Sequence, residues 1–406
     1  MFRIRIEAQF LMLNEVVDIV SQFEFVPKRL LGIISGYIFF LTIAMKRHSF
    51  RQAGQILGPH ESRFCALMND PETPKTSKSI LSRTLRRRIA RMKKFKGRLT
   101  FIIDATIKKR RGKNVENIRR YHHGSGLVMG QKFVNFVILD ECGNVVPIES
   151  IPVYTMKYCL KNGIKYRTEI DVVVDWLKEF PSTNLISQKQ IDSAVFLLDA
   201  GYDAKEIQKE IKAMGSDFVM ALKSSRTVNG RQVAELFRRT RKVYAWEAIR
   251  LQAGNGGTGS RRNYSIRTAH VVNLKGFGPT HVVCSKADHN SNKPKKYLVT
   301  SSLEMTGRDV VEWYTKRWKI ETWHREMKQN YGFIDCHSAR FTAIESHVNF
   351  SLTAYLLQKE SGKKQKRVEE YVWQKELLKI QKELRKYGSN KKVRSLVSAA
   401  LQAVAA

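Results

Sequence analysis

Two acidic residues stand where carboxylates could serve a metal-dependent phosphodiester reaction. Asp104 ends the apolar run LTFIID (99–104), and Asp199 follows the apolar part of SAVFLLDAGY (193–202). Both runs have the composition of buried strands, so each aspartate is expected at the edge of a sheet. A lone aspartate there is usually a turn or cap residue. Two at related places could instead converge and hold metal ions about 4 Å apart, as phosphodiester cleavage by two metals requires.

A third carboxylate lies in a segment with helical periodicity, YTKRWKIETWHREMK (314–328). At 100° per residue, Tyr314, Arg317, Glu321 and Lys328 fall within one stripe about 60° wide. An apolar face runs beside this stripe, so Glu321 is expected next to the boundary of the core. Arg317 and Glu321 are also an i,i+4 pair, and by geometry alone they could equally be a surface salt-bridge ladder.

The spacing of these four residues matches a known signature. Tyr314, Arg317, Glu321 and Lys328 resemble, at every spacing, the Y-R-E-K signature of the fourth insertion-sequence family of bacterial cut-and-paste DDE transposases. IIDAT (102–106) is similar to the first-Asp motif of that family, and DAGY (199–202) to the second. The resemblance covers about residues 99–350.

The resemblance implies a role for each matching residue. The three carboxylates Asp104, Asp199 and Glu321 would be catalytic and would bind two Mg²⁺ ions, for which Mn²⁺ would substitute. Arg317 would grip a phosphate near the transposon end through a bidentate fork, and Lys328 would do so as a point charge. Tyr314 would contact the DNA backbone beside the cut.

One position departs from the pattern of the family. The family has a tryptophan in the strand before the glutamate helix, and that ring stacks on a base flipped out during hairpin formation. Here the strand begins KKYLVTS (295–301), and Tyr297 stands at that place. An aromatic face can still stack on a base, so Tyr297 is the expected DNA contact at this place.

The order of expected elements agrees with an α/β, RNase H-like (retroviral-integrase-like) core. Three strands, a helix, a strand, a helix and a strand follow one another between residues 99 and 223, a suggestive order that does not by itself decide the fold. We therefore expect five regions: a helical DNA-binding region with a basic segment (1–98), the first part of the core (99–223), a mostly β insertion (224–296), the second part of the core with the glutamate helix (297–360), and a helical C-terminal region (361–406).

The charge of the chain indicates a polyanionic partner. Lys and Arg number 72 against 37 Asp and Glu, a formal net charge of +35, and the basic residues are spread over most of the chain. Each cation that meets a phosphate releases a condensed counterion, which favours nucleic-acid binding. In the segment 83–98, Arg86 and Arg87 are candidate DNA contacts, and Lys108 in KKRR (108–111) could line the active-site groove, although a solvated helix or loop would look the same.

The N-terminal region offers two further features. Residues 49–69 are expected to form helix, Gly-Pro turn and helix, a weak signal for a helix-turn-helix DNA reader, and residues 69–79 are expected to form a linker. Leu30–Met45 is apolar but shorter than the ~20 residues that span a bilayer, so we expect a buried helix and no membrane partner.

The chain has five cysteines and no CxxC pair, which is typical of a reduced intracellular protein. We therefore expect it in the bacterial cytoplasm, associated with the nucleoid.

These observations favour a DNA transposase that cleaves the ends of a mobile element and joins the freed 3′-OH to new DNA, through a hairpin intermediate. Its partners would be the terminal inverted repeats, target DNA and a second copy of the chain in a synaptic complex. Two alternatives stay open on the sequence alone: a catalytically inactive DNA-binding regulator, and a host nuclease on the same RNase H-like scaffold.

Overall fold

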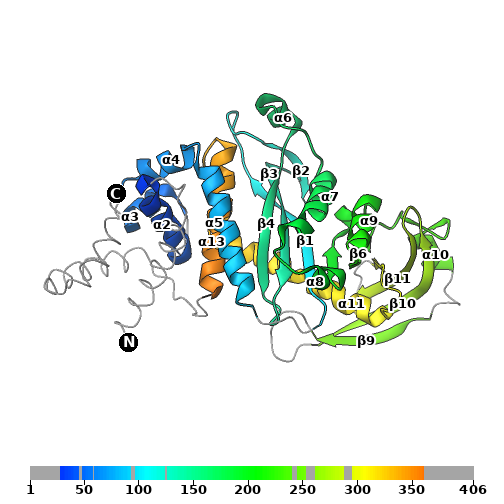
Figure 1. Cartoon of the computed structure of the whole chain (residues 1–406). Helices are drawn as coiled ribbons and strands as arrows, with labels where there is room; N and C mark the ends of the chain where they lie inside the picture. The colour runs from blue at the N-terminus through cyan, green and yellow to red at the C-terminus, as the bar shows by residue number, and fades with distance from the viewer. Residues whose placement is uncertain are drawn as a thin grey trace. The chain divides into compact units, whose positions relative to one another are not determined.

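The computed structural model of the chain describes residues 28–44, 48–57, 59–92, 97–123, 126–239, 245–252, 261–287 and 295–360. These residues form two compact units, each of which is built from several stretches of the sequence (Figure 1). The first unit contains residues 28–91, 108–131 and 324–360. The second contains residues 92–107 and 132–323.

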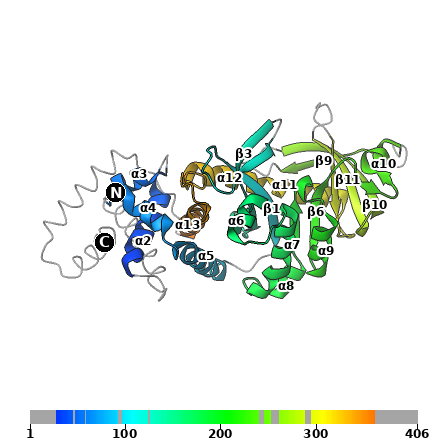
Figure 2. The same cartoon turned by 90° about the horizontal axis from the view of Figure 1, so that it is seen from above.

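The first unit is mainly helical. Its helices are α2 (Lys28–Ile43), α3 (Phe50–Leu57), α4 (Glu61–Asn69), α5 (Thr73–Ala90) and α13 (Phe341–Glu360). The helix α13 is buried along most of its length, and α5 and α2 pack along it; Figures 1 and 2 both show α5 beside α13. Since α13 is apolar on all sides, neighbours must cover more than one of its faces.

The apolar segment near the N-terminus forms the expected buried helix. Ile34, Tyr37, Ile38 and Phe40 of α2 are fully buried, and α2 contacts α3, α4 and α13. Within the described part of the chain, no helix is long and apolar enough to cross a membrane.

A buried polar chain connects α2 to α13. The Tyr37 hydroxyl lies 2.8 Å from His347 Nδ1, and His347 Nε2 lies close to the carbonyl oxygen of Gly332. Both contacts are satisfied by a neutral imidazole in which Nε2 carries the proton. Burial lowers the pKa of His347 to about 3, and the positive charge of Lys108 adds to this effect. The imidazole is therefore neutral at physiological pH.

The second unit is built around a mixed sheet. Its strands are β1 (Thr100–Lys109), β3 (Gly126–Leu139), β4 (Val145–Val153), β5 (Val195–Leu198), β6 (Asp217–Leu222), β7 (Thr227–Val228), β8 (Arg231–Gln232), β9 (Glu247–Gln252), β10 (Arg261–Leu274), β11 (Gly278–Ala287) and β12 (Lys296–Thr300). The last residues of β1 and the first residues of β3 belong to the first unit. The core of the sheet has the spatial order β4-β3-β1-β5-β6. β1, β5 and β6 are parallel, and β3 and β4 are antiparallel. The expected RNase H-like fold is confirmed by this arrangement.

The insertion extends the core sheet instead of forming a separate one. β12 pairs antiparallel with β6, β11 pairs with β12, and β10 pairs with β11. β9 pairs with β10 on the other edge of that strand. The segment after β6 also contains the helix α10 (Val233–Arg239). The described residues between 224 and 296 are therefore mostly in β-strands.

Helices cover the sheet of the second unit. They are α6 (Met156–Asn162), α7 (Glu169–Glu179), α8 (Gln188–Asp192), α9 (Lys205–Ala213) and α11 (Gly307–Lys316). An aromatic cluster joins α7 to the sheet: Trp176 stacks on Phe136 of β3, and Phe180 packs on Phe101 of β1. Phe101 also stacks on Phe196 of β5, with the ring centroids 4.5 Å apart. This cluster fixes which face of β1 and β5 meets α7.

Two local expectations are wrong. Residues 73–79 belong to α5 and are not a linker, because Pro74 stands in the first turn of that helix, where the missing N–H is tolerated. The second concerns Asp203, which the sequence predicts as a helix cap because Glu206 follows at the spacing of a capping box. The N-cap of α9 is instead Ala204, and the Asp203 carboxylate contacts Gln208 and Arg226. The expected helical C-terminal region, 361–406, lies outside the described residues.

Candidate active site

Asp104 and Asp199 stand side by side on neighbouring parallel strands. Ile103 of β1 is in register with Leu198 of β5, and the two aspartates are the next residue on each strand. Asp199 keeps an extended backbone, with φ −88° and ψ 169°, before the chain turns into the short 3₁₀ helix at Ala200–Tyr202. Residues that follow in register on parallel strands present their side chains to the same face. The sheet therefore brings the two carboxylates together.

The two aspartates lie on the face of the sheet opposite to α7. Side chains alternate along a strand, so Asp104 points away from the face on which Phe101 meets α7. The same alternation places Asp199 on the face opposite to Phe196, and α11 covers that region of the sheet. Both aspartates are partly buried, in contrast to the fully buried apolar residues before them.

The expected single helix over 314–328 is interrupted at Arg317. α11 begins with a capping box, in which Thr306 and Asp309 bond to each other's backbone N–H groups as the sequence predicts. It ends at Lys316, and α12 (Trp318–Asn330) follows after one turn residue. The N–H of Arg317 bonds to the Tyr314 carbonyl, and the N–H of Ile320 bonds to the Arg317 carbonyl. These i→i−3 bonds tighten the chain locally at Arg317.

Arg317 connects the glutamate helix to β1. Its guanidinium is buried, lies 3.5 Å from Asp104 Oδ2 and donates a hydrogen bond to Glu321 Oε1. Burial alone would lower the pKa of Arg317, but the Tyr314 phenol and the carboxylates of Asp199, Asp104 and Glu321 raise it, so the side chain stays charged. A buried cation is tolerated because carboxylates surround it. The i,i+4 pair is thus part of a site and not an exposed ladder.

Tyr314 contacts the second aspartate. Its hydroxyl donates a hydrogen bond to Asp199 Oδ1 at 3.2 Å, and its ring is buried. Burial and the nearby Asp199 carboxylate raise the pKa of Tyr314 well above its ordinary value, against the opposing effect of Arg317. The phenol is therefore a hydrogen-bond donor at neutral pH and orients Asp199.

Asp104 is less acidic than an ordinary aspartate. Burial raises its pKa to about 6; Arg317 and the N–H of Ala105 oppose this effect, and the charges of Asp199 and Glu321 add to it. Three carboxylates that repel one another, held around one cation, form a site with a high affinity for positive charge.

The sequence region that supplies most of this site matches a known family. Residues 164–357 match the family model described as "Transposase DDE domain". Residues 164–357 of this chain form a transposase DDE domain. The matched region includes Asp199, Glu321 and the other signature residues, whereas Asp104 lies before it and is associated with them by the geometry of the sheet.

Two further comparisons were made for this transposase. A search of curated proteins finds no match. Among solved structures, the chain is similar to the piggyBac transposase in a cryo-EM structure of its synaptic complex with hairpin DNA. The sequence identity is 12%, the alignment covers 98% of this chain and 85% of that chain, and the TM-score is 0.47.

The carboxylates of the transposase fit a divalent metal by their chemistry. Carboxylate oxygens are the ligands that Mg²⁺ prefers, and those of Asp104 and Asp199 share one face of the sheet, although Asp104 lies in the middle of β1 and not at the expected edge. Within the described part of the chain, however, no three His, Cys, Asp or Glu side chains are placed to hold one ion together. Glu321 is joined to Asp104 through Arg317, so direct binding of one ion by all three carboxylates would need a change of side-chain conformation.

Lys328 and Tyr297 are two further residues to which the resemblance assigns DNA contacts. Lys328 is on α12, two turns after Glu321, and is half-buried. Tyr297 is on β12, where one face of its ring stacks on Phe237 of α10 with the centroids 6.0 Å apart. One aromatic face of Tyr297 is therefore already covered by protein.

The basic candidates differ in exposure. Arg86 is exposed on α5, whereas Arg87 is half-buried and bonds to Glu360 of α13 at 3.1 Å. Lys108 is only 1% exposed, and its ammonium donates to the carbonyl of Cys336. This burial does not favour the predicted DNA contact of Lys108, because a side chain bound inside the first unit is not presented to a phosphate.

One residue near the site has a contact that sequence reasoning did not anticipate. Tyr202 of the DAGY motif is buried, and its hydroxyl donates to Glu169 Oε1 at 2.8 Å. Glu169 also pairs with Lys132 of β3. Burial raises the pKa of Tyr202, and the charges of Glu169, Asp104 and Asp199 add to the rise. The DAGY motif was a signal for this position, but its partner Glu169 has no sequence signature.

Proposed function

We propose that this DDE transposase cleaves DNA at the ends of a mobile element and joins the freed 3′-OH to new DNA by a cut-and-paste route. The observation that carries the proposal is the convergence of Asp104, Asp199 and Glu321 around Arg317. A protein that only binds DNA has no physical need for three mutually repelling carboxylates, one of which is only weakly acidic.

The proposed metal ligands are the same three carboxylates, with two Mg²⁺ ions that Mn²⁺ would replace. Such ions polarise the scissile phosphodiester, activate the attacking oxygen and stabilise the leaving one. The protein supplies the position of the ligands. Strands β1 and β5 fix Asp104 and Asp199 in register, and Tyr314 holds one oxygen of Asp199 by a hydrogen bond.

Arg317 has two tasks in the proposed reaction. It compensates the negative charges of Asp104 and Glu321. Once the carboxylates bind metal ions instead of Arg317, its planar guanidinium can bind a DNA phosphate through a bidentate fork. Lys328 would bind a second phosphate as a point charge, and Tyr314 would contact the backbone beside the cut.

We also propose that the chain belongs to the bacterial Y-R-E-K group and acts on terminal inverted repeats and target DNA as a homodimer in a synaptic complex. It would act in the bacterial cytoplasm, next to the nucleoid. Residues 1–98 would bind DNA, with Arg86 and Arg87 among the contacts. A hairpin intermediate would depend on Tyr297, whose free face must stack on the displaced base.

The experiment is an excision assay on a plasmid that carries the native flanking DNA of the gene, with Mg²⁺. It compares the wild type with Asp199→Asn and with a control, Asp175→Asn. Asp175 is a half-exposed residue of the same unit that pairs with Arg167. We expect excised ends from the wild type and the control only, and joined products when target DNA is added.

Three other results would contradict the proposal in different ways. Cutting by both the wild type and Asp199→Asn would mean that the active site lies elsewhere. Cutting without any joined product would favour a host nuclease. Binding without cutting by all three proteins would favour a DNA-binding regulator.

A further inference from the structure

A two-stranded ribbon in the first unit has one exposed face, which carries both polar and apolar side chains. The strand β2 (Arg119–His123) pairs antiparallel with the first residues of β3, so that Arg120 stands opposite Met129 and His122 stands opposite Leu127. Paired residues share a face, and residues two apart along a strand share it too. These four side chains therefore form one surface, here called the ribbon face.

The two sides of this ribbon differ in burial. On the ribbon face Arg120, His122, Leu127 and Met129 are all exposed, and Leu127 is 59% exposed. On the other side Tyr121 is buried, with the Arg119 guanidinium 4.6 Å from the centre of its ring. The ribbon is thus anchored on one side and presents the other to solvent.

The base of the ribbon is fixed to the segment between α12 and α13. Arg110 donates hydrogen bonds to the carbonyls of Cys336, His337 and Ser338. The N–H of Glu116 bonds to the Ala339 carbonyl at 3.0 Å. These bonds hold the ribbon on a rigid base, so its exposed face has a defined position in the unit.

The charge around the ribbon face indicates the chemistry of its partner. Lys109, Arg111 and Lys113 are exposed in the segment that leads into β2, and Arg120 lies on the face itself. Within the described ranges, none of these four cations forms an ion pair with a carboxylate. A purely apolar face would suit another protein, whereas an apolar centre bordered by unpaired cations complements the grooves and phosphates of duplex DNA.

We propose that the ribbon face is a DNA-binding surface of the transposase that enters a groove of duplex DNA. A two-stranded β-ribbon fits the major groove of B-DNA, which is about 12 Å wide. Leu127 and Met129 would contact apolar groups in the groove, and Arg120 with the neighbouring cations would bind the flanking phosphates. This inference rests on the proposed function, because it assumes that DNA is the substrate.

The test measures binding of the full chain to fluorescent duplexes over a range of salt concentrations. One duplex carries the native transposon end, and the other has a scrambled sequence. The ribbon variants are Leu127→Asp and the double variant Arg111→Ala with Arg120→Ala. The controls are Leu160→Asp, at a position of α6 that is 78% exposed, and Lys157→Ala on the same helix.

We expect Leu127→Asp to weaken binding by at least about tenfold, because it puts a carboxylate next to phosphates, whereas Leu160→Asp leaves binding unchanged. The double variant should reduce the slope of log K against log salt by about 1.8, since each lost phosphate contact removes about 0.9. Loss on both duplexes indicates backbone contacts, and loss on the native end alone indicates base readout. Either result supports the proposal. Unchanged thermal unfolding confirms that the variants fold.

Binding and salt slopes equal to those of the wild type for both ribbon variants would overturn the proposal. Unchanged DNA binding together with an altered oligomeric state, measured by light scattering, would assign the ribbon face to a protein partner instead. Failure here is separate from failure of the proposed function, because Asp199→Asn reports on cutting and the ribbon variants report on binding.

Discussion

Arg317 decides how the signature residues act together. Its guanidinium contacts Asp104 on β1 and Glu321 on α12, and it is buried next to Asp199. A buried ion pair stabilises a protein little by itself, because desolvation offsets most of the attraction. We propose instead that Arg317 keeps these carboxylates close together until metal ions replace it as their partner.

Replacing Glu321 by Gln is expected to reduce excision more than about a hundredfold while DNA binding is unchanged, because the amide keeps the shape and loses the charge that the reaction needs. The matched control is Glu326→Gln on the same helix, where Glu326 has the same side-chain exposure, 30%, and pairs with Lys359. If Glu321→Gln excises DNA as well as this control, Glu321 is not a catalytic residue.

Tyr314→Phe tests a smaller contribution. The change removes only the hydroxyl that bonds to Asp199 Oδ1 and keeps the buried ring. A single hydrogen bond contributes about 1 kcal/mol, so excision should fall about fivefold to tenfold, far less than for Glu321→Gln. The measurement is the initial rate of excision at saturating DNA. A rate equal to that of the wild type would show that Asp199 needs no help from Tyr314.

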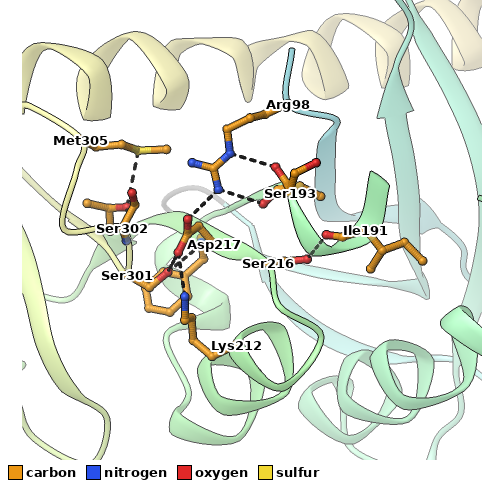
Figure 3. A network of polar contacts seen from close by, with 12 residues as sticks. Arg98, Ile191, Ser193, Lys212, Ser216, Asp217, Ser301, Ser302 and Met305 are labelled. Carbon is orange, nitrogen blue, oxygen red and sulfur yellow. Dashed lines mark hydrogen bonds and ion pairs between the residues drawn. The ribbon is translucent and has the colours of Figure 1, made fainter. Parts of the chain in front are cut away.

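Among the secondary-structure elements, the carboxylate of Asp217 connects several strands near their starts by hydrogen bonds. Asp217, the first residue of β6, accepts hydrogen bonds from Arg98 before β1, from Lys212 on α9 and from Ser301 after β12 (Figure 3). Arg98 also bonds to the carbonyls of Ser193 and Ala194 before β5. This network lies at the starts of the parallel strands, whereas Asp104 lies in the middle of β1 and Asp199 directly after β5. It holds the register of these strands.

Asp217→Asn is expected to lower the free energy of unfolding by about 2 kcal/mol at pH 7, since hydrogen bonds to a charged group are lost. Burial alone would raise the pKa of Asp217, but its bonds to Arg98, Lys212 and Ser301 lower it. The stabilisation is therefore complete above the pKa of the unfolded chain and disappears as the pH falls through the lower pKa of the folded state.

The check for Asp217→Asn is denaturant unfolding at several pH values. The difference between the wild type and Asp217→Asn should shrink below about pH 4. Asp175→Asn, a half-exposed aspartate of the same unit, should show little difference at any pH. A difference for Asp217→Asn that is independent of pH would contradict the role of its charge.

The connection after α12 depends on a glycine. Gly332 has φ +62°, and a Cβ there would stand 2.5 Å from the Cβ and Cγ of His48. Gly332→Ala should therefore destabilise the first unit by about 2 kcal/mol or more, through backbone strain and overlap together. Gly163→Ala is the matched control, because Gly163 has φ +64° and open space around it. Equal losses of thermal stability for the two variants would show that His48 moves aside at no cost.

For the whole molecule, the charge of +35 has a measurable consequence. DNA binding by the cutting-deficient Asp199→Asn variant should weaken steeply as salt rises, with a slope of log K against log salt steeper than about −5, as expected for six or more phosphate contacts. Anisotropy titrations at salt concentrations from about 50 to about 300 mM would measure this slope. A flat dependence would mean that the cations do not serve DNA binding.

Sequence patterns predicted much of the fold because they act locally. Strand alternation located β1, β5 and β6, and the spacing of Thr306 and Asp309 predicted the capping box of α11. Local patterns failed where a long-range contact competes with them. Asp203 forms an ion pair with Arg226 and does not cap α9, which begins without a side-chain cap.

The sequence by itself determined which residue types stand at the site, since Asp104, Asp199 and the four signature residues are recognisable from spacing alone. Only the tertiary structure decided their partners. Register between β1 and β5 places the aspartates together, and the turn at Arg317 directs its guanidinium to Asp104. Lys108, four residues after Asp104, was a candidate DNA contact because of its charge, but it is buried against Cys336. Charge and periodicity are properties of one segment, whereas burial and pairing depend on segments that are distant in sequence.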